Sequence, residues 1–193
     1  MTNKSFFVYA LTNLNLNDKI ITYGDSALNN VQLKILELMS QVTNRMDLTM
    51  FAQKINLAPT DVIANVQELT NEGLVHKTSR GYGVTDKGKT TLKAFTQTPE
   101  DKAFHFYARI ECPTAYTAQS LIDFYNIIQQ IDEDSLNFHL SRGDFEKWFN
   151  DVLADSELAK KVEAIKKTPL QHDIIRKELL NAIDQKYGLK DLL

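Results

Sequence analysis

The sequence predicts a mainly α-helical protein with one small β-hairpin, divided into two regions. Three observations predict this fold class. Apolar residues recur at helical spacing over most of the chain, and a short alternating run turns on glycines near residue 81. A polar, proline-containing stretch at 96–101 separates two periodic regions. We therefore expect an N-terminal extension over 1–29, a first domain over 30–98 and a helical domain over 99–193, which suits a length of 193 residues.

The extension over 1–29 carries the weakest signals. Apolar and β-branched runs at 6–11 and 19–23 suit short strands, with an Asn-rich link between them. Helix is an alternative that the pattern leaves open for the same residues.

The first domain begins with three predicted helices. Asn30 is a good N-cap for a helix over 30–42, and a short second helix covers 49–55. Pro59 suits the first position of a third helix, because proline is tolerated there. Gly73 fits the left-handed position that follows the last turn of that helix.

A hairpin and a fourth helix follow. Residues 74–78 alternate well enough for a strand, and a second strand begins at residue 84. The turn between them, 79–83, contains two glycines. Asp86 is the expected cap of a fourth helix that reaches residue 95.

This order of elements and three short motifs resemble the winged helix-turn-helix of MarR-like transcription regulators. The resemblance covers about residues 30–95 and implies that the third helix enters a major groove, which is about 12 Å wide, while the hairpin tip contacts phosphates. The motifs are Leu48-Thr49-x-x-Ala52, Leu69-x-x-x-Gly73-Leu74-Val75 and Thr85-Asp86-Lys87-Gly88-Lys89.

The resemblance implies a set of contacts to duplex DNA. Amide side chains on the third helix can pair with adenine, and the cations and hydroxyl groups of the hairpin region can reach the backbone. A solvated hairpin with no DNA contact is the alternative reading of the cations. The expected contact residues are Thr60, Asn65, Gln67, Lys77, Arg80, Tyr82, Lys87 and Lys89.

The residues of the third helix disfavour strong recognition of a specific DNA sequence. It carries no Lys or Arg, and Asp61, Glu68 and Glu72 repel phosphates. We therefore expect modest, salt-dependent affinity unless two copies bind together. The alternative function is a protein-interaction adaptor without DNA binding, in which Ile63 and Ala64 form an exposed apolar contact.

Charge divides the chain in the same place as the periodicity. Residues 1–98 carry 10 Lys and Arg against 8 Asp and Glu, whereas residues 99–193 carry 12 against 17. The chain as a whole has a net charge of −3, so no overall positive field directs it to nucleic acid. A basic half and an acidic half predict two different tasks. We expect a homodimer that uses the last helix and the aromatic segment 104–110, or a protein partner bound through the acidic half.

The second half is expected to be mainly helical. Its aromatic start, 104–110, has an extended conformation as one option. A helix over 118–131 is apolar around more than half its circumference and should be central to the core. The other expected helices cover 135–140, 144–153, 155–165 and 170–186.

Part of this half resembles a small helical family of unknown function. The string from Ser135 to Trp148 fits the family pattern SLxFHxxRGDFxxW, and the resemblance covers about residues 104–187. Ala154 departs from the pattern, since glycine is more usual there. The resemblance implies a fold and does not imply a reaction.

Four polar or aromatic residues of this string form a second candidate site. They allow three readings: a structural hydrogen-bond network with a bend at Gly143, a ligand or anion site, or a metal site. A histidine and one carboxylate are too few ligands for a metal. The residues are His139, Arg142, Asp144 and Trp148.

Several classes of protein are disfavoured by composition. The single Cys excludes a disulfide framework within the chain, and no apolar run reaches the 18 or so residues that span a bilayer. No Gly-rich phosphate loop and no nucleophile with a base and an orienting group are visible. We expect a cytoplasmic transcription regulator that is not an enzyme, holds no metal or cofactor and binds no membrane.

Overall fold

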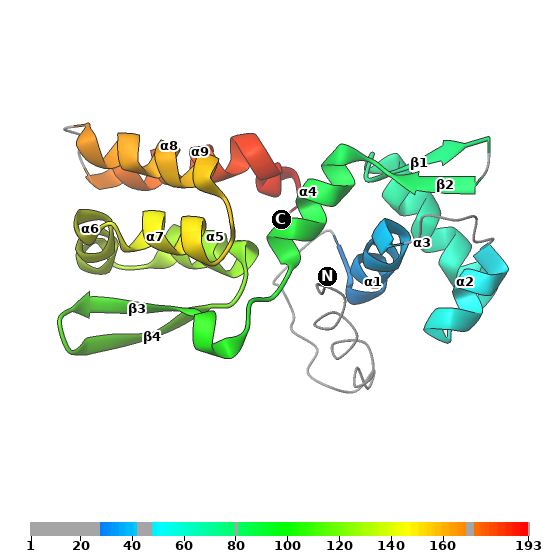
Figure 1. Cartoon of the computed structure of the whole chain (residues 1–193), viewed down its shortest axis with the longest axis horizontal. Helices are drawn as coiled ribbons and strands as arrows, with labels where there is room; N and C mark the ends of the chain where they lie inside the picture. The colour runs from blue at the N-terminus through cyan, green and yellow to red at the C-terminus, as the bar shows by residue number, and fades with distance from the viewer. Residues whose placement is uncertain (1–27, 42–47, 80, 169–171, 193) are drawn as a thin grey trace, which may run out of the picture.

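The computed structural model describes residues 28–41, 48–79, 81–168 and 172–192. The expected strands at 6–11 and 19–23, together with Arg80, lie outside these residues. The described chain is mainly helical and contains two separate two-stranded antiparallel sheets. Figure 1 shows α1–α4 with the first sheet at one end of the molecule, and α5–α9 with the second sheet at the other.

The first end, here called the N-terminal unit (residues 28–95), has the predicted order of elements. Each helix buries one apolar face, and the hairpin pairs Lys77 with Tyr82 near its tip. The element bounds are α1 (Asn30–Gln41), α2 (Leu48–Ile55), α3 (Pro59–Asn71), β1 (Val75–Thr78), β2 (Gly81–Val84) and α4 (Asp86–Phe95).

Local chemistry sets the ends of α3 and α4. Pro59 is the first residue of α3, and Gly73 has a φ of 71°, the left-handed conformation predicted for it. The predicted cap of α4 is wrong by one residue. Thr85 is the N-cap, with its hydroxyl accepting from Gly88 N at 3.0 Å, and Asp86 begins the helix. The Thr85 N–H also donates to Leu74 O at 3.0 Å, which ties α4 to the start of the hairpin.

The second end, here called the C-terminal unit (residues 99–192), has three layers. In Figure 1 the β3–β4 hairpin lies on one side, α5, α6 and α7 lie in the middle, and α8 and α9 cover the other side. The bounds are η2 (Glu100–Lys102), β3 (Phe104–Arg109), β4 (Cys112–Ala118), α5 (Leu121–Gln130), α6 (Glu133–Arg142), α7 (Asp144–Asp151), α8 (Ser156–Lys167), α9 (His172–Tyr187) and η3 (Leu189–Leu192).

The second strand of this hairpin corrects the sequence-based expectation of a helical half. The extended option for residues 104–110 is confirmed by β3, but β4 was not predicted. The helix expected over 118–131 begins later, because Ala118 ends β4 and Ser120 caps α5 through a 3.2 Å bond from Asp123 N. The side chains of β4 alternate between half-buried and exposed, a weak contrast that hides the strand in the sequence.

Aromatic rings fill the space between the hairpin and the middle layer. Phe104 and Phe106 of β3 contact Phe124 of α5 with ring centroids 5.8 and 5.7 Å apart. Phe145 of α7 lies 5.1 Å from Phe124 in an edge-to-face arrangement. The Trp148 indole lies in the same cluster and donates its N–H to Lys102 O at 2.8 Å.

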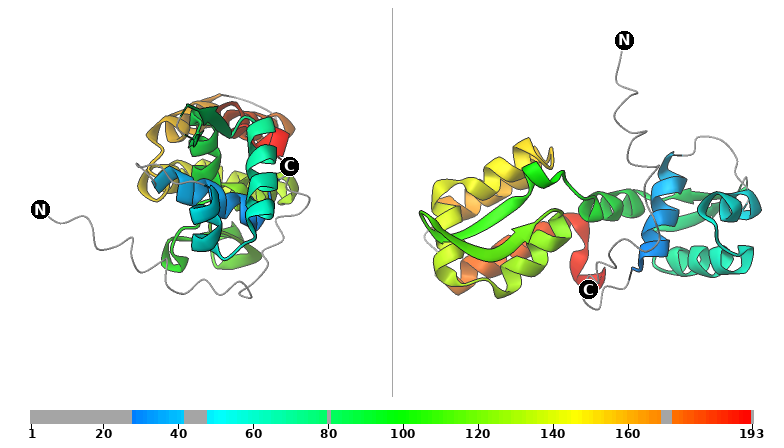
Figure 2. Two further views of the ribbon diagram at one scale, coloured as in Figure 1. Left: turned by 90° about the vertical axis from the view of Figure 1, so that its right-hand side faces the viewer. Right: turned by 90° about the horizontal axis from the view of Figure 1, so that it is seen from below.

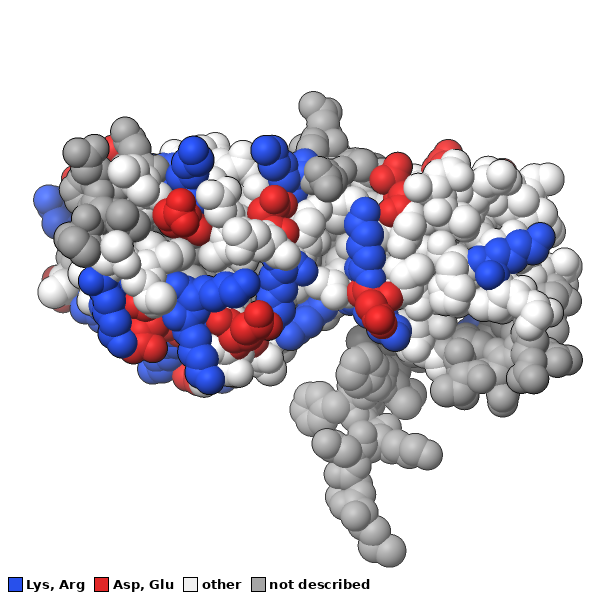
Figure 3. All heavy atoms as spheres, turned by 90° about the horizontal axis from the view of Figure 1, so that it is seen from above, with Lys and Arg blue, Asp and Glu red and all other residues white. Residues whose placement is uncertain are grey.

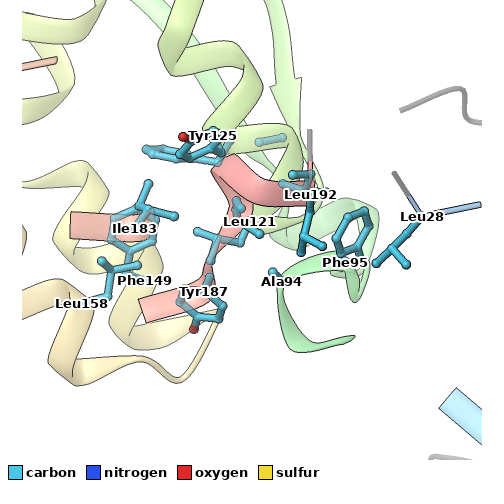
Figure 4. Close-up of a cluster of buried hydrophobic side chains, with 14 of the residues drawn as sticks. Leu28, Ala94, Phe95, Leu121, Tyr125, Phe149, Leu158, Ile183, Tyr187 and Leu192 are labelled. Carbon is cyan, nitrogen blue, oxygen red and sulfur yellow. The ribbon is translucent and has the colours of Figure 1, made fainter. Parts of the chain in front are cut away.

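The two units share one apolar core through α4. This helix packs against α1 and β2 on one side and against α5 and α9 on the other. Figure 4 shows Phe95 of α4 between Leu28 and Leu192, with Ala94 facing Leu121 and Tyr187. Apolar burial therefore continues from the N-terminal unit into the C-terminal unit.

The apolar faces expected to form a dimer are partly used inside the chain. Phe104 and Phe106 are buried under α5 and α6, and Leu179 and Ile183 of α9 are buried against the rest of the C-terminal unit. Ile110 and Ile174 of the same two segments are 72% and 42% exposed, so a dimer through these segments stays a prediction. Residue 170, where the last helix was expected to begin, lies outside the described residues.

Candidate functional site

The outward face of α3 forms the first candidate site. Val62, Val66 and Leu69 recur at helical spacing and are buried against α1, α2 and β1. Figures 1 and 2 both place α3 and the β1–β2 hairpin at the end of the molecule far from the C-terminal unit. The exposed residues along the outer face are Thr60, Asp61, Ile63, Ala64, Gln67 and Glu68.

Some polar groups of this face already have partners. Asn65 is half-buried and donates its amide to Asp61 O at 2.8 Å, so this amide group is engaged within the helix. Glu68 accepts from Gln32 Nε2 at 2.7 Å, which ties α3 to α1. Of the three predicted contacts on α3, Thr60 and Gln67 are exposed, and the Thr60 hydroxyl donates to Asp61 Oδ1 at 3.4 Å.

The hairpin presents the second group of candidates. Lys77 and Tyr82 are cross-strand partners, and both are exposed. His76 lies opposite Gly83, where a Cβ atom would stand only 3.1 Å from the imidazole Cε1. Arg80, the remaining candidate between residues 78 and 81, lies outside the described residues.

The two lysines at the start of α4 contact the protein itself. Lys87 Nζ donates to Glu72 O at 3.0 Å, and it thereby satisfies a carbonyl at the C-terminal end of α3. Lys89 Nζ pairs with Asp86 Oδ1 at 2.9 Å, and the pKa of Asp86 is lowered by this hydrogen bond and charge. Lys87 therefore lies beside the end of α3, whereas Lys89 is two residues further along α4.

Charge on this end is sparse. Figure 3 looks down on α8, α9 and the β1–β2 hairpin, and the part over the N-terminal unit is mostly uncharged. The part over α8 and α9 instead shows blue and red side by side, as expected from pairs such as Lys167–Glu163 at 2.7 Å. Among the described residues, the lysines of the hairpin and of the start of α4 are Lys77, Lys87 and Lys89, and the last two also contact the protein itself, so their contact with DNA stays a prediction.

The second candidate site is a buried hydrogen-bond network around His139. Its side chain is 4% exposed; Nε2 accepts from Tyr107 N at 2.8 Å, and Nδ1 lies 2.9 Å from Asp144 Oδ2. Arg142 Nε donates to the same carboxylate oxygen at 3.1 Å. Gly143, with a φ of 77°, makes the bend that brings Asp144 back toward α6, as the sequence predicted.

These partners determine the protonation state of the imidazole. Because Nε2 accepts a backbone N–H, the ring proton is on Nδ1 and is donated to Asp144. Burial lowers the pKa of His139, and it outweighs the hydrogen bond and charge of Asp144, which would raise it. Every ring nitrogen is satisfied by the protein, which favours the structural reading of this cluster.

A surface depression of about 520 Å³ lies beside this network. His105, Ile110, Phe138 and Arg142 are among the residues that line it, and Trp148 is not. The four predicted residues therefore do not form one site: His139, Arg142 and Asp144 meet, while Trp148 belongs to the aromatic core behind Phe104.

A third polar network escaped sequence reasoning. Asp155, which is 3% exposed, accepts from Leu158 N, Lys186 Nζ and Tyr187 Oη at 3.0, 2.7 and 2.5 Å. Burial alone would raise the pKa of Asp155, but these hydrogen bonds outweigh it and lower the pKa. Burial and the Asp155 carboxylate raise the pKa of Tyr187. The only local signal was Asp155 as a helix cap, because its partners come from α9.

The described residues offer neither a metal site nor a membrane span. No group of three or more His, Cys, Asp or Glu side chains in residues 28–41, 48–79, 81–168 and 172–192 is placed to hold a metal ion. In the same ranges no helix is long and apolar enough to cross a membrane. Comparison with family models, curated proteins and solved structures found no match to the chain. What the two resemblances imply about function stays a prediction.

Proposed function

We propose that residues 30–95 form a winged helix-turn-helix that binds duplex DNA, with α3 in the major groove and the β1–β2 hairpin on the backbone. One observation carries the proposal. The outer face of α3 and the exposed side chains of Lys77 and Tyr82 lie at the free end of the molecule, away from the C-terminal unit. Exposed Gln67 and Thr60 are the groups on α3 suited to a base and a phosphate.

The charges set the expected strength of this binding. Lys77, Lys87 and Arg80 supply the cations near the duplex, while Asp61 and Glu68 on α3 oppose it. Binding therefore depends on a few phosphate contacts, and its affinity falls steeply with salt. Two copies on adjacent half-sites about 34 Å apart would double these contacts, so we propose a homodimer on DNA. In this proposal the acidic C-terminal unit senses a ligand or binds a protein partner.

Fluorescence anisotropy with a labelled random-sequence duplex tests the proposal. Replacing Lys77 and Arg80 together by Glu should weaken binding about tenfold or more and flatten its salt dependence. The matched control replaces Lys147 and Lys160, two exposed lysines of the C-terminal unit, by Glu. It makes the same change in net charge and should leave the affinity within about twofold. Equal losses in both variants would show that only overall charge matters.

A protein-interaction adaptor is the second candidate function, and Ile63 favours it. This side chain is 49% exposed on an anionic helix, and Ala64 beside it is exposed as well. A partner with a basic rim around an apolar centre would suit this face. Under this alternative the wild-type protein binds no duplex even at low salt. Replacing Ile63 by Asp would then abolish capture of the partner while leaving the fold intact, because Ile63 is outside the core.

A further inference from the structure

A pocket of about 500 Å³ lies at the junction between the two units. Its wall comes from α4, from the connection that follows α4, from the start of α5, from the segment between α7 and α8, and from the ends of α1 and α9. Of the residues expected to contact DNA, only Lys89 lines this pocket. No residue of the His139 network lines it. Ligand sites commonly occur at such junctions between units.

One side of the pocket is apolar and rigid. Leu121 is buried in the shared core, and Tyr187 is held in place by its 2.5 Å hydrogen bond to Asp155. These side chains do not need to be ordered when a ligand binds, which lowers the entropic cost of association. The apolar lining consists of Leu92, Pro99, Leu121, Val152, Leu153 and Tyr187.

The other side of the pocket is cationic. Lys89 and Lys93 are four residues apart on α4, so they lie on one face of the helix and repel each other. Lys89 is paired with Asp86, but that carboxylate is 97% exposed and the pair is weak. Lys93 makes no ion pair with the described residues, and no Asp or Glu lines the pocket. An anion placed here would relieve the repulsion between the two lysines.

A hydrogen-bond donor without a partner lies in the same wall. The Thr98 hydroxyl is buried and has no hydrogen-bond partner among the described residues, whereas the Thr98 N–H donates to Gln119 O at 2.6 Å. Buried hydroxyl groups are almost always satisfied, and this one lies in a pocket with two cations. A carboxylate oxygen would accept from it and would also pair with the ammonium groups.

We propose that this pocket binds a small amphipathic carboxylate, with the charged group between Lys89, Lys93 and Thr98 and the apolar tail against Leu121, Leu153 and Tyr187. A single ligand of this kind would account for an unpaired hydroxyl, for the unpaired Lys93 beside the weakly paired Lys89, and for an apolar wall. A multiply charged anion without a tail would leave the apolar wall in water, so the tail is part of the recognition.

Calorimetric titration of the full chain with octanoate tests the proposal. Octanoate should bind saturably at one site. Acetate, which lacks the tail, should bind about a hundredfold or more weakly, and octanol, which lacks the charge, about tenfold more weakly. Replacing Lys93 by Glu should lower the octanoate affinity about tenfold or more, and because Lys93 is exposed this change leaves the fold intact. Replacing Lys160 by Glu should have no effect.

A second variant tests whether octanoate occupies the volume of this pocket. Replacing the half-buried Leu153 by Trp should fill the pocket and remove octanoate binding, with circular dichroism as the check that the chain is folded. The proposal is overturned if octanoate gives no saturable heat, if acetate binds equally well or if the Lys93 variant binds unchanged. No DNA is present in the titration, so failure here is distinct from failure of the proposed DNA binding.

Discussion

Ala154 adopts a backbone conformation that glycine adopts at less cost. Its φ is 50°, in the left-handed region, between α7 and α8. An L-residue with a Cβ atom costs roughly 1–2 kcal/mol in that region, and a glycine removes the cost at the expense of a more flexible unfolded chain.

Replacing Ala154 by Gly should therefore stabilise the protein. We expect the free energy of unfolding in urea to rise by about 0.5–1 kcal/mol, the difference between the two opposing effects. The control is Ala164→Gly, at an exposed position inside α8, which should lower it by about 1 kcal/mol. A loss of stability in the Ala154 variant would contradict the strain assigned to this residue.

His139 gives the stability of the fold a pH dependence. Because its pKa is lower in the folded chain than the ordinary 6.5, the unfolded chain takes up the proton first. The stabilising contribution of neutral His139 should thus be fully present above pH 6.5, and the free energy of unfolding should fall as the pH is lowered below that value. Urea unfolding at pH 7.5 and 5.5 measures the difference.

The variant His139→Gln should remove this dependence, since an amide can accept from Tyr107 N and does not titrate. His105→Gln, at an exposed position of the same hairpin, should keep it. An unchanged pH profile in the His139 variant would assign the dependence to other groups.

At the scale of elements, Asp155 joins α8 to α9. It caps α8 through Leu158 N and holds the end of α9 through Lys186 and Tyr187. Replacing Asp155 by Ala should lower the free energy of unfolding by about 2–4 kcal/mol, because a cap is lost and buried donors lose their acceptor. Glu157 also binds Lys186, at 2.6 Å, but it is exposed and its ion pair is screened by water, so Glu157→Ala should lower the stability far less. Thermal unfolding of the two variants makes the comparison, and equal losses would contradict a special role for the buried carboxylate.

The elements also show what the sequence could and could not predict. The ends of α3 and the bend at Gly143 were predictable because proline and glycine act within a few residues. Strand β4 was missed because its stability comes from pairing with β3 and not from a strong apolar alternation. His139 and Asp144 were grouped correctly, since they are five residues apart, but the Tyr107 N–H that fixes the tautomer comes from another element.

At the scale of the whole molecule, α4 has two roles. It completes the core of the N-terminal unit and packs on α5 and α9, so the division expected at 96–101 is a covalent connection between two units with a common apolar core. The end that carries α3 and the hairpin is left uncovered by this packing. The carboxylate pocket proposed beside α4 shares only Lys89 with the residues expected to contact DNA.

Amide NMR shifts during titration with a duplex at low salt test DNA binding by the N-terminal unit. We expect the shifts to concentrate in α3 and in the β1–β2 hairpin, around Gln67, Lys77 and Tyr82, and we expect α8 to be unaffected. A duplex that moves amides mainly in the C-terminal unit, or that moves none, would contradict it.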